Sequence, residues 1–264
     1  MPKRPFLSVV VAATALAAAI TISTTTFAQV WNSHGMIGAQ QAPQTGPAPV
    51  RDLTGTWDAG GAGLAPRGSP TAPLTAWGEK KVGTHRAGDG PRSAPIDQIN
   101  DPLSTMCDPA GFPRLLLFEL RPFQVAHTPN QVLMMYMFEK RFRTIWTDGR
   151  TLPKDPDPRW YGYSVGRWED DYTFVVDTIG MDEKTWLDNA GNPHSNDMRV
   201  EERYRRVNMG TVELTVTIND ATAYTKPWVA RNKLPLRLIP SNVDLMELIC
   251  SATEAQEYKK VMGK

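Results

Sequence analysis

From residue 114 onwards, apolar and polar residues alternate in short runs, and this pattern predicts a mainly β protein. Turn residues such as Asp148-Gly149 and Glu169-Asp170-Asp171 separate several of the runs. We expect strands over residues 114–120, 123–127, 132–146, 163–168, 172–178, 198–207, 211–218, 234–239 and 243–250. Because most of these runs follow one another as hairpins, they favour an antiparallel up-and-down barrel or a sandwich.

The chain before residue 114 has a different character. Residues 52–57 have the pattern of a first strand, but 59–113 are rich in Gly and Pro and show no sustained period. We therefore expect a long irregular insertion, or a lid, between the first strand and the regular body. Short helices are expected at 74–81, capped by Thr75, and at the C-terminus over 252–261, capped by Ser251 or Thr253.

The N-terminal residues predict export. The basic pair Lys3-Arg4 precedes an almost wholly apolar run, and small residues at 26 and 28 suit signal-peptidase cleavage before Gln29. The alternative is a membrane anchor, but the run is short and Ala-rich for a span, which needs about 20 apolar residues. We expect a signal peptide over 1–28, a flexible linker over 29–51 and one β-barrel domain over 52–264. The expected location is periplasmic or secreted, with no integral membrane span after cleavage.

Charge and cysteine usage narrow the class of partner. Without the signal peptide the chain keeps 27 basic and 28 acidic side chains, which gives no footprint for nucleic acid or an anionic membrane surface. Two cysteines, Cys107 and Cys250, indicate one disulfide in an exported chain, with two free thiols as the alternative. We expect neither a metal nor a cofactor, because two distant cysteines cannot complete a metal site and no dinucleotide fingerprint occurs.

Two stretches resemble known families. Gly55-Thr56-Trp57 at the first strand is similar to the Gly-x-Trp signature of lipocalins, in which the Trp plugs the closed end of a β-barrel. This resemblance implies a lipocalin-like barrel, and Cys250 in the last strand looks like half of the disulfide that such barrels use. Segments within residues 107–250, among them 161–171 and 202–206, resemble a family of exported bacterial proteins of unassigned function. The second resemblance implies no reaction.

The run 132–146 supplies most of the candidate binding residues, because alternation divides it into two faces. One face is mainly apolar and includes Met134, Tyr136 and Trp146. The other begins apolar and becomes charged, and it consists of Leu133, Met135, Met137, Glu139, Arg141, Arg143 and Ile145. If this face lines a barrel, it offers the apolar walls and few polar groups that are typical of ligand pockets. The alternative is an ordinary solvent-exposed face.

Charged residues also occupy the run 198–207, where Glu202 and Arg206 share a face with Val200 and Tyr204. A charge that points inward must be paired, and cross-strand Glu–Arg ladders are the alternative interpretation. Asp177 interrupts another apolar run. It is either a strand-end turn residue or an inward carboxylate suited to general base chemistry.

Histidines provide the remaining candidates. His194 lies in the turn 191–195, which we place beside the barrel mouth, and loops on a rigid scaffold often carry function. A surface position without function is the alternative. His127 ends a strand, but it has no close histidine neighbour in sequence that would indicate a metal site.

These features favour a periplasmic barrel that binds a small apolar or aromatic molecule with a polar or anionic end. The candidate binding residues are Arg143, Met135, Met137, Trp146, Trp168, Tyr136 and His127. One alternative is a cofactor-independent lyase, isomerase or hydratase with His194, Asp177, Glu139 and Arg141 as candidate catalytic residues. In that enzyme His194 or Asp177 moves a proton and Arg141 stabilises an oxyanion. The other alternative is a structural protein of the envelope.

Overall fold

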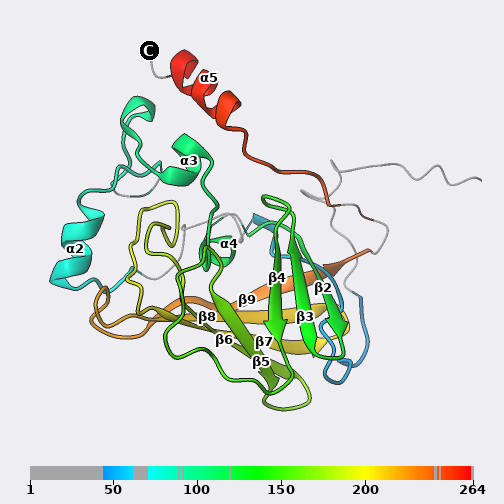
Figure 1. The fold of residues 1–264 in the computed structure, drawn as a ribbon. Helices are drawn as coiled ribbons and strands as arrows, with labels where there is room; N and C mark the ends of the chain where they lie inside the picture. The colour runs from blue at the N-terminus through cyan, green and yellow to red at the C-terminus, as the bar shows by residue number, and fades with distance from the viewer. Residues whose placement is uncertain are drawn as a thin grey trace, which may run out of the picture. The chain divides into compact units, whose positions relative to one another are not determined.

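A computed structural model describes residues 44–61, 71–88, 90, 92–118, 120–240, 243 and 245–262 of the chain. Within these residues nine strands close into a barrel, and each strand lies beside the one that precedes it in sequence (Figure 1). The strands are β1 Gly55–Asp58, β2 Phe123–Thr128, β3 Gln131–Tyr136, β4 Phe142–Trp146, β5 Tyr163–Trp168, β6 Thr173–Ile179, β7 Arg199–Asn208, β8 Thr211–Asn219 and β9 Trp228–Ile239. The mainly β character that the alternation predicts is confirmed. The predicted signal peptide and most of the linker lie outside the described residues.

Neighbouring strands pair antiparallel with one exception. Strands β4 and β5 are parallel and pair only through Trp146 and Val165, which corrects the prediction of a wholly antiparallel barrel. The cause lies in residues 147–162, which return along the barrel so that β5 starts from the same end as β4. The predicted hairpins β5–β6 and β7–β8 are confirmed.

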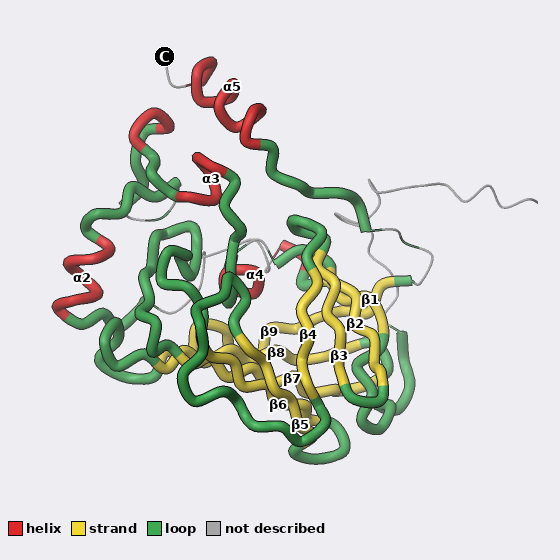
Figure 2. Tube along the Cα trace, in the orientation of Figure 1, coloured by secondary structure: helices red, strands yellow, loops and turns green. Residues whose placement is uncertain are grey.

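The connections between strands fall at two opposite ends of the barrel. The turns β2–β3, β5–β6 and β7–β8 share one end, which we call the hairpin end. The β3–β4 turn and the long connections 59–122, 180–198 and 220–227 share the other, which we call the covered end. Figure 2 shows the helices outside the ring of strands, in the long connection 59–122 and in the C-terminal segment.

The helices begin where local capping groups allow. Helix α2, Ala76–Val82, has the predicted cap, since the Thr75 hydroxyl accepts a hydrogen bond from Gly78 N at 3.1 Å. The C-terminal helix α5, Ala252–Met262, is also confirmed, and Ser251 Oγ accepts from Glu254 N at 3.4 Å. The described part of 59–113 further contains the 3-10 helix η3, Ile96–Gln98, and helix α3, Pro102–Met106. In the whole described part of the chain, no helix has the length and apolar character needed to cross a bilayer.

Three of the predicted strands are wrong. Part of the first one, Arg114–Leu117, forms helix α4, because a short apolar run suits a buried helix as well as a strand. The run 132–146 is the β3–β4 hairpin, whose turn contains Glu139 and Lys140 with positive φ values of 58° and 49°. The described residues of 243–250 form no strand, apart from an isolated bridge. Cys250 therefore precedes α5 instead of lying in a last strand, yet it forms the expected disulfide with Cys107.

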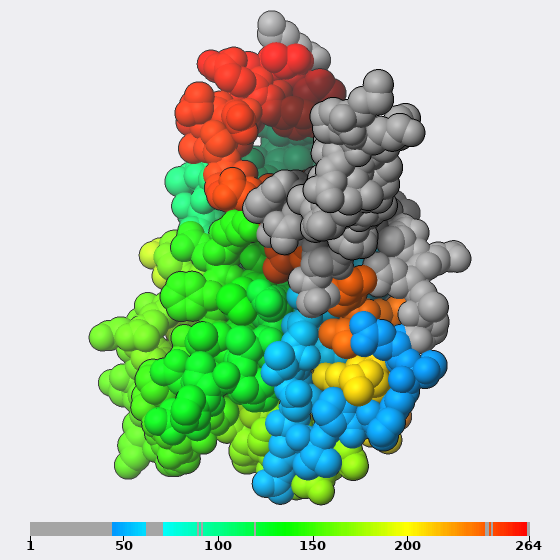
Figure 3. Space-filling model, turned by 90° about the vertical axis from the view of Figure 1, so that its right-hand side faces the viewer, coloured from blue at the N-terminus to red at the C-terminus, as the bar shows by residue number. Residues whose placement is uncertain are grey.

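Packed side chains close both ends of the barrel. At the hairpin end, buried Trp57 donates Nε1–H to Leu53 O at 2.9 Å, and the Arg206 guanidinium lies 4.6 Å from the centre of its ring. Residues from 44 onwards, blue in Figure 3, lie against the yellow β7–β8 turn, where Met209 N donates to Gly46 O at 3.1 Å. At the covered end the buried residues Phe112 and 115–117 belong to the core. Trp57 therefore closes the hairpin end, and residues of the connection 59–122 close the covered end.

Candidate functional site

A buried ion pair lies inside the barrel and joins two strands that are not neighbours in the ring. Arg143 of β4 donates to both carboxylate oxygens of Glu202 of β7, at 2.6 and 2.9 Å. The two side chains are at most 2% exposed. Both residues point inward because alternate positions of each strand face the interior: Arg143 and Ile145 on β4, and Val200, Glu202 and Tyr204 on β7.

Hydroxyl groups complete the surroundings of this pair. Arg143 donates to Ser164 Oγ at 2.9 and 3.0 Å and to Thr178 Oγ1 at 2.7 Å. The Tyr204 hydroxyl donates to Glu202 at 2.7 Å. These five residues come from four strands, β4 to β7, so that the closed barrel is what brings them together. We call Arg143, Ser164, Thr178, Glu202 and Tyr204 the interior polar cluster.

Burial fixes the protonation states around the cluster. It raises the pKa of Tyr136 to about 12, and it raises the pKa of Tyr204 well above its ordinary value. Burial disfavours the charge of Arg143, but the Glu202 carboxylate outweighs that effect and the pKa of Arg143 is raised. The guanidinium is therefore charged at neutral pH, and both tyrosines keep their protons and act as hydrogen-bond donors.

Phe112 covers the cluster from the covered end. Its ring centre lies 3.8 Å from the Arg143 guanidinium, in the geometry of a cation–π contact. Phe112 N donates to Trp160 O at 2.9 Å, and Ala110 N donates to the Glu139 carboxylate at 3.1 Å. A few residues further on, Leu117 O accepts from the buried Arg231 side chain of β9 at 2.6 Å. Phe112 belongs to residues 107–118, which we call the roof segment.

The four candidate catalytic residues do not meet. His194 is fully buried instead of exposed in a surface loop, and it contacts Thr185 Oγ1 at 2.9 Å and Ser195 O at 2.9 Å. Asp177 lies on the outer face of β6, where it pairs with Arg167 at 2.7 Å. Glu139, in the β3–β4 turn, accepts a hydrogen bond from the Tyr161 hydroxyl at 2.8 Å. Arg141 is exposed. No two of these four described residues are hydrogen-bonded to each other.

The candidate binding residues are divided between the interior and the outside. Arg143 and Tyr136 lie inside, and the Tyr136 hydroxyl contacts Met134 Sδ at 3.5 Å. Met135 is half-buried on the other face of β3, whereas Met137 is buried just beyond its end.

The last three candidates lie toward the strand ends. Trp146 carries the Arg150 guanidinium over its ring at 3.4 Å. Trp168 stacks on His127 with ring centres 6.3 Å apart, and His127 Nε2 accepts from Leu53 N at 3.1 Å.

Sequence reasoning missed part of the cluster. Glu202 and Tyr204 were recognisable as one strand face, and the rule that a buried charge needs a partner pointed to an inward pair. Ser164 and Thr178 are short polar residues in apolar strands and give no signal of their own. Phe112 precedes the first regular strand run, and nothing local places it above Arg143. Among the described residues no group of three or more metal-ligating side chains comes together.

Comparisons with known proteins provide no relative from which a function could be inferred, so the function is argued from the geometry of the barrel. No family model, curated protein or solved structure matches the chain. The closed nine-stranded barrel and the buried Trp57 on its first strand are compatible with a lipocalin-like barrel.

Proposed function

We propose that the barrel binds a small aromatic molecule with a polar, uncharged end, in the space now occupied by the Phe112 ring. The observation that carries this proposal is an aromatic ring of the chain itself, held 3.8 Å from a buried guanidinium that already has its counter-ion. An aromatic ligand would take the place of that ring. Its polar group would exchange hydrogen bonds with the interior polar cluster.

The interior polar cluster supports a binding function, because a stable barrel interior could be built from apolar side chains alone. A buried ion pair is often no more stabilising than apolar residues of the same volume. Ligand pockets, in contrast, combine apolar walls with a few fixed polar groups. Here Met134 lies against both tyrosine hydroxyls, at 3.5 Å from Tyr136 and 3.6 Å from Tyr204, beside the polar cluster.

The charge balance of the cluster favours an uncharged ligand over an anion. Glu202 occupies both outer nitrogens of Arg143, so an incoming carboxylate would face a buried carboxylate without a free cation. A hydroxyl or amide avoids this repulsion. The polar end of the ligand is therefore expected to be neutral. Of the two kinds of end that the sequence left open, polar or anionic, this selects the uncharged polar one.

We further propose that the protein is exported. A disulfide is typical of an oxidising compartment, and Cys107–Cys250 is such a bond. Together with the predicted signal peptide, it favours the periplasm or the exterior. Mass spectrometry of the chain recovered from a bacterial periplasm should find Gln29 as its first residue. An intact N-terminus in the cytosolic fraction would contradict export.

A binding experiment with two matched probes tests the proposed function. Isothermal titration of the full-length mature protein with 2-naphthol, an uncharged aromatic alcohol, should give saturable binding, and 2-naphthoate should bind at least about tenfold more weakly. The double variant Arg143→Met with Glu202→Leu removes the polar cluster and keeps an apolar interior. We expect it to lose about tenfold or more in 2-naphthol affinity.

The matched control replaces an ion pair on the outside of the same barrel. Arg167→Met with Asp177→Leu removes the pair on the outer face of β5 and β6 and should leave 2-naphthol binding unchanged. Absence of 2-naphthol binding by the wild-type protein would overturn the proposal and favour a packed structural barrel. Equal loss in both double variants would also overturn it, since binding would then not depend on the interior.

A further inference from the structure

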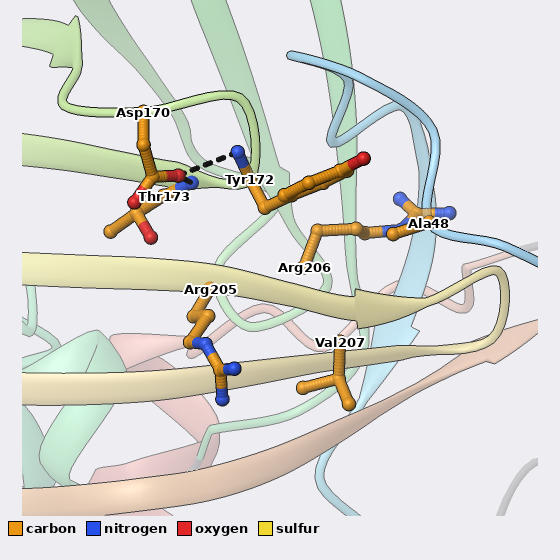
Figure 4. A pocket seen from close by; sticks show the side chains of 7 residues that line it. All are labelled: Ala48, Asp170, Tyr172, Thr173, Arg205, Arg206 and Val207. Atoms are coloured by element: carbon orange, nitrogen blue, oxygen red, sulfur yellow. Dashed lines mark hydrogen bonds between the residues drawn. The ribbon is translucent and has the colours of Figure 1, made fainter.

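The outer surface of the hairpin end contains a hollow of about 400 Å³. Its walls come from the β5–β6 turn, the end of β7 and Ala48, which precedes β1 (Figure 4). A hollow of this volume lies within the range of small-molecule sites, roughly 300–1,000 Å³. It is separate from the interior polar cluster, because none of the lining residues belongs to that cluster.

Arg206 in this wall is a buried cation bonded only to neutral groups. Its side chain donates to Asn208 O at 3.0 Å, Asp52 O at 3.2 Å and Met209 O at 2.6 Å, which are all backbone carbonyls. A guanidinium has five N–H groups, so these bonds leave one on each terminal nitrogen. Burial lowers the pKa of Arg206, and the Asp52 charge only partly opposes this effect.

Two other buried arginines, Arg143 and Arg114, are neutralised directly, whereas buried Arg231 donates to the backbone carbonyls of Leu116 and Leu117. Arg143 has Glu202, and Arg114 donates to both oxygens of Asp101 at 2.6 and 2.9 Å. No carboxylate of the described residues forms an ion pair with Arg206. Because a buried charge without a counter-ion is costly, an anion that reaches Arg206 gains a strong, charge-assisted partner.

The other charges of the hollow are already engaged. Arg205 pairs with Glu213 at 3.2 Å. The Asp170 carboxylate accepts hydrogen bonds from Tyr172 N and Thr173 N, both at 2.7 Å, and is held in the β5–β6 turn. Arg206 is therefore the guanidinium of the walls that has no ion-pair partner among the described residues, and its charge favours a negative ligand.

Tyr172 adds an aromatic surface beside Arg206. Figure 4 shows the two side chains running in the same direction, toward Ala48, while Arg205 and Val207 point to the other side of β7. Tyr172 is 42% exposed, so its ring is accessible to a ligand. A flat ring can stack on the phenol while its acidic group reaches the guanidinium.

We propose that this hollow binds a small aromatic carboxylate, with the carboxylate on the terminal nitrogens of Arg206 and the ring against Tyr172. The ligand class differs from that of the barrel interior, because here the cation has no carboxylate of its own. The site is independent of the function proposed above.

Isothermal titration with benzoate tests this site, with benzamide as the uncharged counterpart. Benzoate should bind the wild-type protein at least about tenfold more tightly than benzamide, and more weakly as salt increases. Tyr172→Ala, an exposed change that leaves the barrel intact, should weaken benzoate about fivefold or more. Arg206→Lys keeps the charge but loses the planar fork, and it should weaken benzoate about tenfold or more.

Two controls locate the binding. Arg167→Met, which removes an exposed arginine elsewhere on the barrel, should not change benzoate affinity. The interior double variant Arg143→Met with Glu202→Leu should not change it either, so a failure of the interior site remains distinguishable. No detectable benzoate binding, equal binding of benzamide, or unchanged affinity in Tyr172→Ala would each overturn the proposal.

Discussion

At the scale of single residues, Arg143 and Glu202 act as one unit, because neither charge can stay buried without the other. Both side chains are almost fully removed from solvent. The hydroxyls of Ser164, Thr178 and Tyr204 bond to the pair, and those of Ser164 and Thr178 also bond to each other at 3.0 Å. A buried charge that loses its partner is far more costly than an apolar replacement of both. The stability effects of substitutions here are therefore strongly coupled.

A double-mutant cycle measures this coupling. Glu202→Leu alone leaves Arg143 unpaired and should lower the free energy of unfolding by about 3–5 kcal/mol. The double change Arg143→Met with Glu202→Leu should cost much less than the sum of the two single changes. Urea denaturation of the wild type, both single variants and the double variant provides the four values. Additive losses would show that the pair is not a unit.

Three histidines give the protein a predictable response to acid. Burial lowers the pKa values of His85, His127 and His194 from their ordinary value of 6.5. Between the folded and unfolded pKa values the unfolded chain binds more protons, so acidification favours unfolding. The contribution of these histidines to the free energy of unfolding should be fully present above about pH 6.5 and should fall as the pH drops below it. Urea midpoints at a neutral and a mildly acidic pH measure the effect.

His127→Gln provides the matched variant for this response. The amide oxygen of Gln can still accept the hydrogen bond from Leu53 N, which His127 Nε2 accepts at 3.1 Å. Because Gln does not titrate, the variant should lose less stability on acidification than the wild type. The carboxylates with lowered pKa values, such as Asp52 and Asp170, lose their contribution only at lower pH. An unchanged acid response in His127→Gln would contradict the role of this histidine.

At the scale of elements, prediction succeeded where alternation and turn residues agreed. The β5–β6 turn contains Asp170, whose carboxylate caps two backbone N–H groups, so that the local sequence specifies the hairpin. The β3–β4 turn lacks such a signal, since Glu139 and Lys140 are not the residues that commonly adopt positive φ. The turn also changes parity: even positions face inward on β3 and odd positions on β4. Met135 and Arg143 therefore share no face.

The cluster itself was only partly predictable for a related reason. A strand pattern gives the two faces of one element, and it placed Glu202 with Tyr204 correctly. It does not say which strands lie opposite each other, and the Arg143–Glu202 contact spans 59 positions of the chain. Phe112 depends on the roof segment, whose path is set by contacts with Trp160 and Glu139 that are distant in sequence.

Gly111 makes the roof segment testable as an element. Its φ is 75°, and a Cβ there would lie 2.4 Å from Thr185 Cγ2. Gly111→Ala should displace the roof segment and destabilise the protein by about 1–3 kcal/mol. Hydrogen exchange should become faster in residues 107–118 and stay unchanged in β7 and β8. Gly149→Ala is the control, because its φ is 84° but no atom lies within 4 Å of an added Cβ.

At the scale of the whole molecule, the ring of strands and the connections that cover one end of it are two distinct parts. The ring of nine strands carries the interior polar cluster. The long connections at the covered end supply Phe112, and the disulfide Cys107–Cys250 ties the start of the roof segment to the residues before α5. Glu139 N also donates to Leu248 O at 2.6 Å, which fixes the same C-terminal segment to the β3–β4 turn. The disulfide therefore ties the C-terminal segment to the start of the roof segment, whose later residues Leu116 and Leu117 are bonded to Arg231 of β9.

Removing the disulfide should affect two measurable quantities, the stability of the whole molecule and the rate at which a ligand reaches its interior. The bond joins residues 143 apart, and the chain-entropy relation assigns about 4–5 kcal/mol to a loop of that length. Cys107→Ser with Cys250→Ser should lower the urea midpoint accordingly.

If Phe112 must leave for a ligand to enter, 2-naphthol should also associate faster with this variant than with the oxidised wild type. Addition of a reductant to the wild type should reproduce both changes, and the variant itself should not respond to it. A loss of stability with an unchanged association rate would mean that the ligand reaches the cluster without passing the roof segment.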